Sequence, residues 1–213
     1  MELPGSIPIF PLPNVVLFPE VPLPLHVFEP RYRAMVRDAL AGSRLIGMTL
    51  LRPDWEADYA GAPDVYRVGC AGRIVDVTPL DDGKFNILLA GLREFEVTGE
   101  ERDRAYRRAA VIWREAAPAL TLPPDLRADL FRAVEQHVGA TGRALASEMA
   151  ADEALDDGAL VNFFAFWLDL RPVEKQALLE ERGVGRARRL LEVLEFQRHA
   201  ARLGADPGTR RVH

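Results

Sequence analysis

The sequence contains few of the residues that carry most enzyme chemistry. Its 213 residues include one cysteine, Cys70, and only two lysines, Lys84 and Lys175. A phosphate-binding loop needs a lysine in GxxxxGK followed by Ser or Thr, and neither lysine lies in that context. A single cysteine forms no intramolecular disulfide and no metal-spaced cluster. ATP hydrolysis by a P-loop is therefore excluded, and the small residues around Cys70 predict a buried structural thiol.

Serine and histidine are also scarce. The serines are Ser6, Ser43 and Ser147, and none lies in G-x-S-x-G or S-x-x-K, the patterns that activate a serine nucleophile. The histidines are His26, His137, His199 and His213, far apart and without HExxH spacing. We therefore expect no catalytic residue, no metal site, no cofactor and no enzyme activity. The best role for His26 is a hydrogen bond that fixes the chain near a helix start.

Long hydrophobic runs and concentrated positive charge are missing as well. No apolar stretch approaches the roughly 18–20 residues that cross a bilayer, and no basic segment precedes an apolar one at the N-terminus. These features predict a cytoplasmic protein without membrane contact. The net charge is −5, and the arginines are interleaved with acids. That mixture argues against non-specific nucleic-acid binding, which needs a concentrated basic face.

Proline is plentiful where the chain is most apolar. Half of the sixteen prolines lie at or before Pro30, in a stretch that includes PIFPLPNVVLFPEVPLPLHVFEPRYRAMV. Proline removes a backbone donor, so such apolar pieces favour edge strands and bends over central strands. We expect edge strands on one rim of a barrel, with Ile9, Leu12, Val16 and Phe18 pointing inward. A helix should begin at Pro30, whose φ is already helical, and end at Gly42.

The remaining pattern divides the chain into a β-rich part and a helical part. A buried strand is predicted over 44–51, three strand-like runs over 65–100 and a further strand over 109–113. Asp82-Gly83 indicates a hairpin turn, and Gly91 a bulge or tight bend. Beyond 116–124 only helices are predicted, including one over 160–170 that is apolar almost all round. The sequence thus predicts an α+β protein with a β-rich subdomain over 1–117, a helical bundle over 118–204 and a disordered tail over 205–213.

The opening stretch resembles the start of the amino-terminal, substrate-binding domain of the ATP-dependent protease Lon. Further matches follow in the expected order: Gly47-Met48, VGCAGRI over 68–74, DGKFNILLAGLREFEV over 82–97 and LVNFFAFWLDLRPVEKQALLE over 160–180. The resemblance covers roughly 6–204 and is strongest to free-standing bacterial proteins made of that domain alone. It implies a six-stranded, PUA-like β pseudo-barrel with one helix, followed by a helical bundle.

The same resemblance implies a role in binding polypeptides. In Lon this domain helps to recognise unfolded or degron-bearing chains, and a related domain in cereblon contacts adaptor proteins. We therefore expect a non-catalytic module for unfolded or apolar segments, or for a folded protein partner, with an adaptor or chaperone-like role. RNA binding is the alternative, because PUA-like folds also bind RNA. A small-molecule enzyme without a recognisable motif is a third possibility, which an enclosed polar pocket would favour.

The proline-rich run also supplies the candidate binding residues. Its structural interpretation is a rim of edge strands, in which proline blocks unwanted strand addition. In the functional interpretation, proline holds apolar side chains open for a client chain. The residues predicted to line that groove are Phe18, Val21, Leu23, Leu25, His26 and Phe28. On this hypothesis Leu23→Asp weakens client binding and leaves the fold intact.

Overall fold

The computed structural model describes residues 3–58, 62–101, 103–151 and 155–202. The strands are β1 (Ser6–Leu12), β2 (Pro22–Val27), β3 (Leu45–Leu50), β4 (Val68–Pro79), β5 (Phe85–Glu101) and β6 (Arg108–Trp113). The helices are α1 (Pro30–Ala41), the short 3-10 helix η1 (Trp55–Asp58), α2 (Pro124–Ala151), α3 (Asp157–Trp167), α4 (Pro172–Glu180) and α5 (Gly183–Arg202). The tail predicted to be disordered over 205–213 lies outside the described residues.

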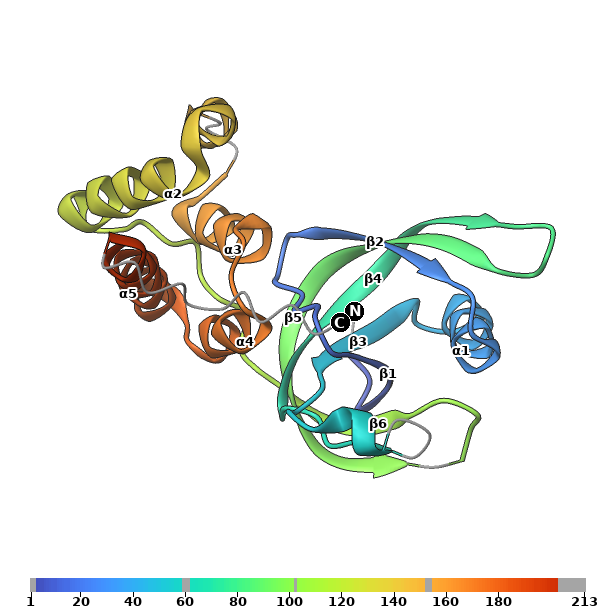
Figure 1. Ribbon diagram of the computed structural model, residues 1–213. Helices are drawn as coiled ribbons and strands as arrows, with labels where there is room; N and C mark the ends of the chain where they lie inside the picture. The colour runs from blue at the N-terminus through green and yellow to red at the C-terminus, as the bar shows by residue number, and fades with distance from the viewer. Residues whose placement is uncertain (1–2, 59–61, 102, 152–154, 203–213) are drawn as a thin grey trace. The chain divides into compact units, whose positions relative to one another are not determined.

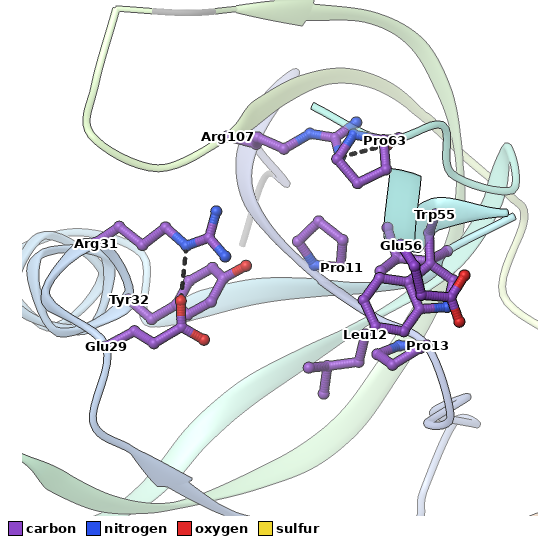
Figure 2. A pocket seen from close by; sticks show the side chains of 11 residues that line it. Pro11, Leu12, Pro13, Glu29, Arg31, Tyr32, Trp55, Glu56, Pro63 and Arg107 are labelled. Atoms are coloured by element: carbon purple, nitrogen blue, oxygen red, sulfur yellow. Dashed lines mark hydrogen bonds and ion pairs between the residues drawn. The ribbon is translucent and has the colours of Figure 1, made fainter. Parts of the chain in front are cut away.

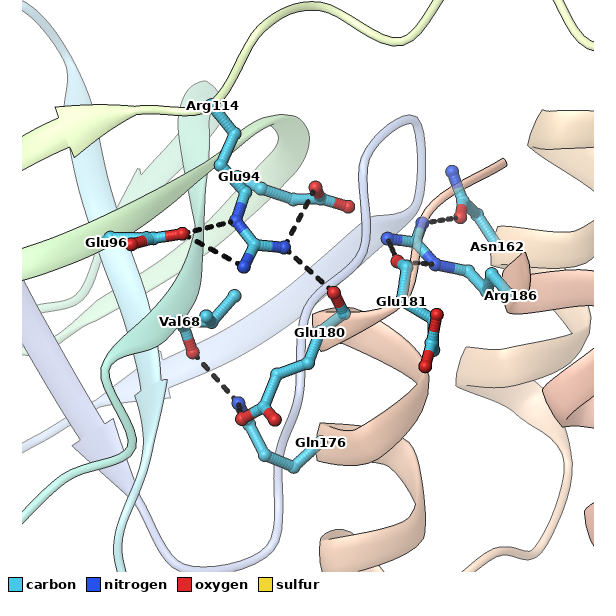
Figure 3. A network of polar contacts seen from close by, with 9 residues as sticks. All are labelled: Val68, Glu94, Glu96, Arg114, Asn162, Gln176, Glu180, Glu181 and Arg186. Carbon is cyan, nitrogen blue, oxygen red and sulfur yellow. Dashed lines mark hydrogen bonds and ion pairs between the residues drawn. The ribbon is translucent and has the colours of Figure 1, made fainter. Parts of the chain in front are cut away.

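The chain forms two compact units, Met1–Ala116 with Asp169–Glu180, and Ala117–Leu168 with Glu181–His213. We call them the sheet unit and the helical unit. The boundary proposed at residue 117 gave α4 to the helical bundle, whereas α4 contacts β4 and belongs to the sheet unit. Gln176 Nε2 donates to the carbonyl of Val68 at 3.0 Å, and Arg114 donates to the carbonyl of Glu180 at 3.0 Å (Figure 3).

The six strands form one mixed sheet in the order β2-β5-β4-β3-β1-β6. A further pairing between β5 and β6 joins the last strand of this order back to the second, and Figure 1 shows the strands curling around a common interior. Alternate side chains of these strands fill that interior. One buried cluster consists of Ile7, Ile9, Ala71, Phe95, Ala109 and Val111. The α+β class is confirmed.

Strand β1 lies inside the sheet, so the expectation that it would be an edge strand is wrong. Its first half pairs with β6, and Ile9–Leu12 pairs in parallel with β3. Ile9 N donates to Arg107 O, and Val111 N donates to Gly5 O, both at 2.9 Å. Because alternate residues of an antiparallel pair exchange hydrogen bonds, the nitrogen of Pro8 faces away from β6. Pro8 therefore costs no hydrogen bond to β6, and proline is compatible with this internal strand.

Strand β2 is the edge strand that its prolines predicted. It pairs only with β5, and its exposed residues are Pro22, Pro24 and His26. Gly91 N donates to Val21 O at 2.9 Å. The backbone nitrogens and carbonyls of every second residue from Val21 onward therefore face β5. The nitrogens of both prolines therefore point to the unpaired side. Proline removes two donors from that side, and a further strand would find few hydrogen bonds there.

Strand β5 is continuous over seventeen residues and bends at Gly91. Gly72 pairs with Gly91 but Ala71 pairs with Arg93, so Leu92 is the extra residue of a bulge. The bulge predicted at Gly91 is confirmed, although one strand replaces the two runs expected there. Before the bulge β5 pairs with β2, and after it β5 pairs with β6. The bend thus lets one strand serve both ends of the sheet.

Helix α1 begins at Pro30, as predicted, and contacts β1 (Figure 1). Its buried residues recur at helical spacing: Tyr32, Met35, Val36 and Ala39. Strand β3 is buried along its whole length. Ile9, Val16 and Phe18 are buried as expected, while Leu12 is only partly buried.

In the helical unit, α2 and α3 both contact α5. The side chains at the centre of these helices are Leu130, Val134, Leu160, Phe164, Leu190 and Leu194. The helix predicted over 160–170 ends at Trp167, which is 57% exposed, and Asp169 beyond it is exposed as well. Within the described residues no helix combines the length and apolarity needed to cross a membrane.

Candidate functional site

A pocket of about 370 Å³ lies within the sheet unit (Figure 2). It is built from the end of β1 and the residues after it, the start of α1, the segment that follows β3, and two residues from later loops. The lining residues are Pro11, Leu12, Pro13, Glu29, Arg31, Tyr32, Leu51, Trp55, Glu56, Pro63 and Arg107. Its volume lies at the small end of the range for ligand sites, which are mostly apolar with a few placed polar groups.

Backbone hydrogen bonds hold the floor of the pocket. Leu51 N donates to Leu12 O at 3.0 Å, which ties the segment after β3 to the end of β1. Leu51 also forms an isolated antiparallel bridge with Val65. Pro11 and Pro13 have fixed φ angles, so this part of the wall has little freedom. The apolar lining is therefore formed before any ligand arrives.

The two aromatic residues of the pocket differ in exposure. Tyr32 is 7% exposed, and its ring stacks on Phe10 with 4.1 Å between the centroids. The guanidinium of Arg31 lies 4.6 Å from the centroid of the same ring. These contacts fix Tyr32 in place. Trp55 on η1 is only partly buried, so its indole supplies accessible aromatic surface.

Each arginine of the pocket has an acidic partner. Arg31 Nε donates to Glu29 Oε2 at 3.0 Å. Arg107 donates to the Glu100 carboxylate through two nitrogens and to the carbonyl of Pro63 at 2.8 Å. Figure 2 shows the Glu29–Arg31 pair and the Arg107–Pro63 contact among the lining residues. Both cations therefore act first as structural ties between segments of the wall.

Candidate nucleophiles and metal ligands do not gather at this pocket. Cys70 is fully buried in the sheet, as predicted. The Ser6 hydroxyl accepts a hydrogen bond from Arg108 at 3.0 Å. In the part of the chain that the structure describes, no group of three His, Cys, Asp or Glu residues is placed to hold a metal ion. The lining itself is mostly apolar, which suits binding through shape and apolar contact.

The predicted binding residues separate into two sets. Phe18, Val21 and Leu23 are buried in the sheet unit, with exposures of 0%, 1% and 6%. Leu25 is partly buried, while His26 and Phe28 are exposed. The six residues therefore do not line one open groove.

The exposed members of that set lie together at the end of β2. The rings of His26 and Phe28 have centroids 6.0 Å apart, and His26 Nδ1 hydrogen bonds with Asn86 Oδ1 at 2.7 Å. The predicted hydrogen bond of His26 is thus confirmed, and it joins β2 to β5. Phe28 is 56% exposed. The residues His26 and Phe28 define a small surface, which we call the β2 patch.

Leu23 is unsuitable as a probe of binding, contrary to the sequence-based expectation. Its side chain is 6% exposed and faces the core of the sheet unit. A carboxylate at that position would be desolvated without a partner. Burial of an unpaired neutral polar group costs roughly 2–7 kcal/mol, and burial of a charge costs more. Leu23→Asp would therefore damage the fold together with any binding site.

Sequence reasoning missed the pocket because its residues come from distant segments. Trp55 was the available signal, because it is an isolated tryptophan in a loop rich in Asp, Pro and Gly. Tyr32 lies on the buried face of its helix and also lines the pocket.

The arginines near β6 are paired with acids. Arg107 pairs with Glu100, Arg108 with Glu101 and Asp103, and Arg104 with Asp38 and Asp103. In the helical unit Arg189 pairs with Glu192. These are the solvated, mixed-charge surfaces that the sequence predicted, and such pairing does not favour the RNA alternative.

Comparison with known proteins gives the family. The family model for the ATP-dependent protease La (LON) substrate-binding domain matches residues 6–196. The chain belongs to this family. A Lon protease of Flavobacterium johnsoniae is 28% identical over 204 residues, which is 92% of this chain and 24% of the relative. A Lon protease of Anaeromyxobacter dehalogenans is 28% identical over 209 residues, 95% of this chain and 24% of the relative. The chain thus spans about a quarter of the length of these relatives.

Solved structures agree with this assignment. The crystal structure of a Lon N-terminal domain protein from Xanthomonas campestris has a TM-score of 0.66 and 27% identity, with 90% of this chain and 98% of that chain covered. The N-terminal domain of a Mycobacterium avium complex Lon protease has a TM-score of 0.65 and 17% identity, with 89% and 98% covered. The second likeness concerns the fold alone. The resemblance noted in the sequence is confirmed.

Proposed function

We propose that this protein is a non-catalytic module that binds unfolded or apolar polypeptide segments, in an adaptor or chaperone-like role. Membership of the LON substrate-binding family supports the class of ligand. The observation that carries the proposal is the preformed apolar pocket beside η1. The cytoplasmic location expected from the sequence is part of the same proposal.

The chemistry of the wall favours insertion of a side chain over addition of a strand. Pro11, Pro13 and Pro63 have no backbone N–H to offer a bound peptide. The affinity must therefore come from apolar and aromatic contact, chiefly with Trp55, Leu12 and the prolines. Because the wall is already rigid, binding orders little of the protein and loses little conformational entropy.

The β2 patch is a second surface that a client could use. It keeps the two exposed members of the residues predicted from the sequence, His26 and Phe28. Pro22 and Pro24 precede it and remove donors from the free edge. A client there would also be held through side chains. We place the pocket first, because it is concave and the patch is carried by one strongly exposed side chain.

The test measures binding of a permanently unfolded, fluorescently labelled polypeptide to the protein and to three variants. Trp55→Ala should weaken binding by about tenfold or more, since tryptophan is a frequent hot spot. Trp167→Ala removes another exposed tryptophan and serves as the matched control. Phe28→Ser reports on the β2 patch. If the pocket is the site, Trp167→Ala and Phe28→Ser should each bind within about twofold of the unmodified protein, because most contacts outside a hot spot contribute little.

The outcomes separate the alternatives. Saturable binding that persists at raised salt and is lost in Trp55→Ala supports the pocket. A loss in Phe28→Ser alone transfers the site to the β2 patch. Salt-sensitive binding to single-stranded RNA, without binding to the polypeptide, would contradict the proposal and favour the RNA alternative.

A further inference from the structure

Within the part of the chain that the structure describes, one carboxylate of the pocket lining has no cationic partner. Glu29 is matched by Arg31, and Arg107 is matched by Glu100. Glu56 is exposed, and its carboxylate has no hydrogen bond or ion pair with any residue in the described part of the chain. The lining therefore combines apolar surface with a single available carboxylate.

Glu56 follows Trp55 directly on η1, so the carboxylate and the accessible indole belong to one turn. Figure 2 shows the two side chains on the same wall, beside Pro13 and Leu12. A lysine or arginine side chain suits this arrangement, because its methylene stem packs on apolar surface while its cation stays near the carboxylate. The face of an indole also attracts a cation. An acidic side chain would meet Glu56 with like charge.

We propose that the pocket selects polypeptide segments in which an apolar side chain lies next to a lysine or arginine, and that Glu56 is the residue that selects the cation. This inference rests on the proposed function, since it specifies which segments the same pocket takes. The apolar side chain fills the space between Leu12, Pro13 and Trp55. The basic neighbour reaches Glu56 at the edge of the pocket, where it remains partly hydrated. The net charge of −5 acts in the same direction during encounter.

The experiment uses three labelled peptides that differ at one position. Each carries the same leucine- and phenylalanine-containing core, followed by Lys, Gln or Glu. Fluorescence anisotropy gives their affinities for the full chain at low and at raised salt. We expect the Lys peptide to bind about threefold to tenfold more tightly than the Glu peptide at low salt, with a smaller ratio at high salt, as for a partly exposed charge pair.

Two isosteric variants identify the residue responsible. Glu56→Gln should bring the Lys and Glu peptides to within about twofold of each other, while the Gln peptide keeps its affinity, because only a charge–charge contact is lost. Glu20→Gln is the matched control: Glu20 is an exposed glutamate of the same unit that does not line the pocket. It should keep the full preference for Lys. Both positions are exposed, so neither variant is expected to disturb folding.

Each result decides a separate point. Equal affinities of the three peptides for the unmodified protein would overturn the charge selection and leave polypeptide binding standing. A preference for Lys that survives Glu56→Gln would assign the selection to another carboxylate and overturn the role of Glu56. If no peptide binds and the permanently unfolded polypeptide also fails to bind, the proposed function itself is wrong.

Discussion

Different kinds of contact stabilise the sheet unit and the helical unit, each within itself. In the sheet unit the critical points are places where backbones approach so closely that only glycine fits. A Cβ atom at Gly91 would lie 2.0 Å from the carbonyl oxygen of Phe18, and one at Gly69 would lie 2.5 Å from that of Met48. A real Cβ atom does not tolerate such distances, so the backbone would have to move.

The helical unit depends instead on polar side chains that satisfy backbone groups. Asp156 accepts hydrogen bonds from the nitrogens of Ala159 and Leu120 at 2.8 and 3.0 Å, which caps α3. Arg186 is 6% exposed and donates to the carbonyl of Glu181 at 3.1 and 2.8 Å. The same guanidinium donates to Asn162 Oδ1, as Figure 3 shows.

This difference predicts opposite sensitivities. The sheet unit should be intolerant of one added methyl group at a close backbone contact, whatever its polarity. The helical unit should tolerate small changes in volume and respond to the loss of one buried donor or acceptor. Substitutions chosen for each mechanism test the comparison directly.

The largest effect is expected for Gly91→Ala. The added Cβ would overlap the carbonyl of Phe18. The atoms nearest to it belong to the backbone, so the clash cannot be relieved by the movement of a side chain. We expect a loss of more than about 3 kcal/mol in the free energy of unfolding, the range of severe strain in a folded core. Urea unfolding followed by far-ultraviolet circular dichroism measures it.

Gly99→Ala is the control for this prediction. It adds the same methyl group to the same strand, β5, at a position where nothing lies within 4 Å of the new Cβ. Its unfolding free energy should change by no more than about 1 kcal/mol, the range of a compatible Gly→Ala change. Similar losses at both glycines would show that strand propensity, and not the close backbone contact, governs the sheet unit.

A smaller but still large effect is expected for Arg186→Ala in the helical unit. The variant leaves the carbonyl of Glu181 and the amide oxygen of Asn162 without this donor in a buried place. Such a loss costs about 3 kcal/mol of unfolding free energy. The measurement is again urea unfolding, with Arg189→Ala alongside. Arg189 pairs with Glu192 on the exposed side of α5, and its removal should cost about 0.3 kcal/mol.

If both arginine variants lost little stability, the proposed contrast between the two units would fail. The helical unit would then be held by apolar packing alone. A full effect at Arg186 with little effect at Arg189 would show that burial, and not the number of ion pairs, decides which arginines matter.

Local features of the fold were predictable because they depend on neighbouring residues. The turn at Asp82-Gly83, the bulge at Gly91 and the helix that starts at Pro30 each follow from conformational preferences of one or two residues. Gly83 has a φ of 76°, which glycine adopts without strain. The position of β1 was not predictable in this way, since it depends on pairing with β3 and β6, which follow much later in the chain.

The pocket was unpredictable for the same physical reason. Its wall joins Pro11, Arg31, Trp55 and Arg107, which are brought together only when the sheet closes. The predicted residues Phe18, Val21 and Leu23 are apolar in a proline-rich run, which fits a groove and a core equally well. Their burial follows from the pairing of β2 with β5 and from the close contact between Phe18 and Gly91.

The smallest effect concerns Tyr106, a buried polar side chain of the sheet unit that forms a hydrogen bond. Its hydroxyl donates to Asp38 Oδ2 at 2.7 Å and joins the loop before β6 to α1. Burial, together with this hydrogen bond, raises the pKa of Tyr106 to about 12. Since the pKa is raised on folding, the protonated phenol stabilises the folded protein fully below the ordinary tyrosine pKa of about 10.

That contribution is lost as the pH rises through 10 towards 12. Tyr106→Phe should cost about 1 kcal/mol near neutral pH, the value of one hydrogen bond. The variant should also lose a tyrosinate absorbance at 295 nm that appears near pH 12 in an alkaline titration. If the titration near pH 12 persists in Tyr106→Phe, the Asp38 contact does not hold the phenol proton.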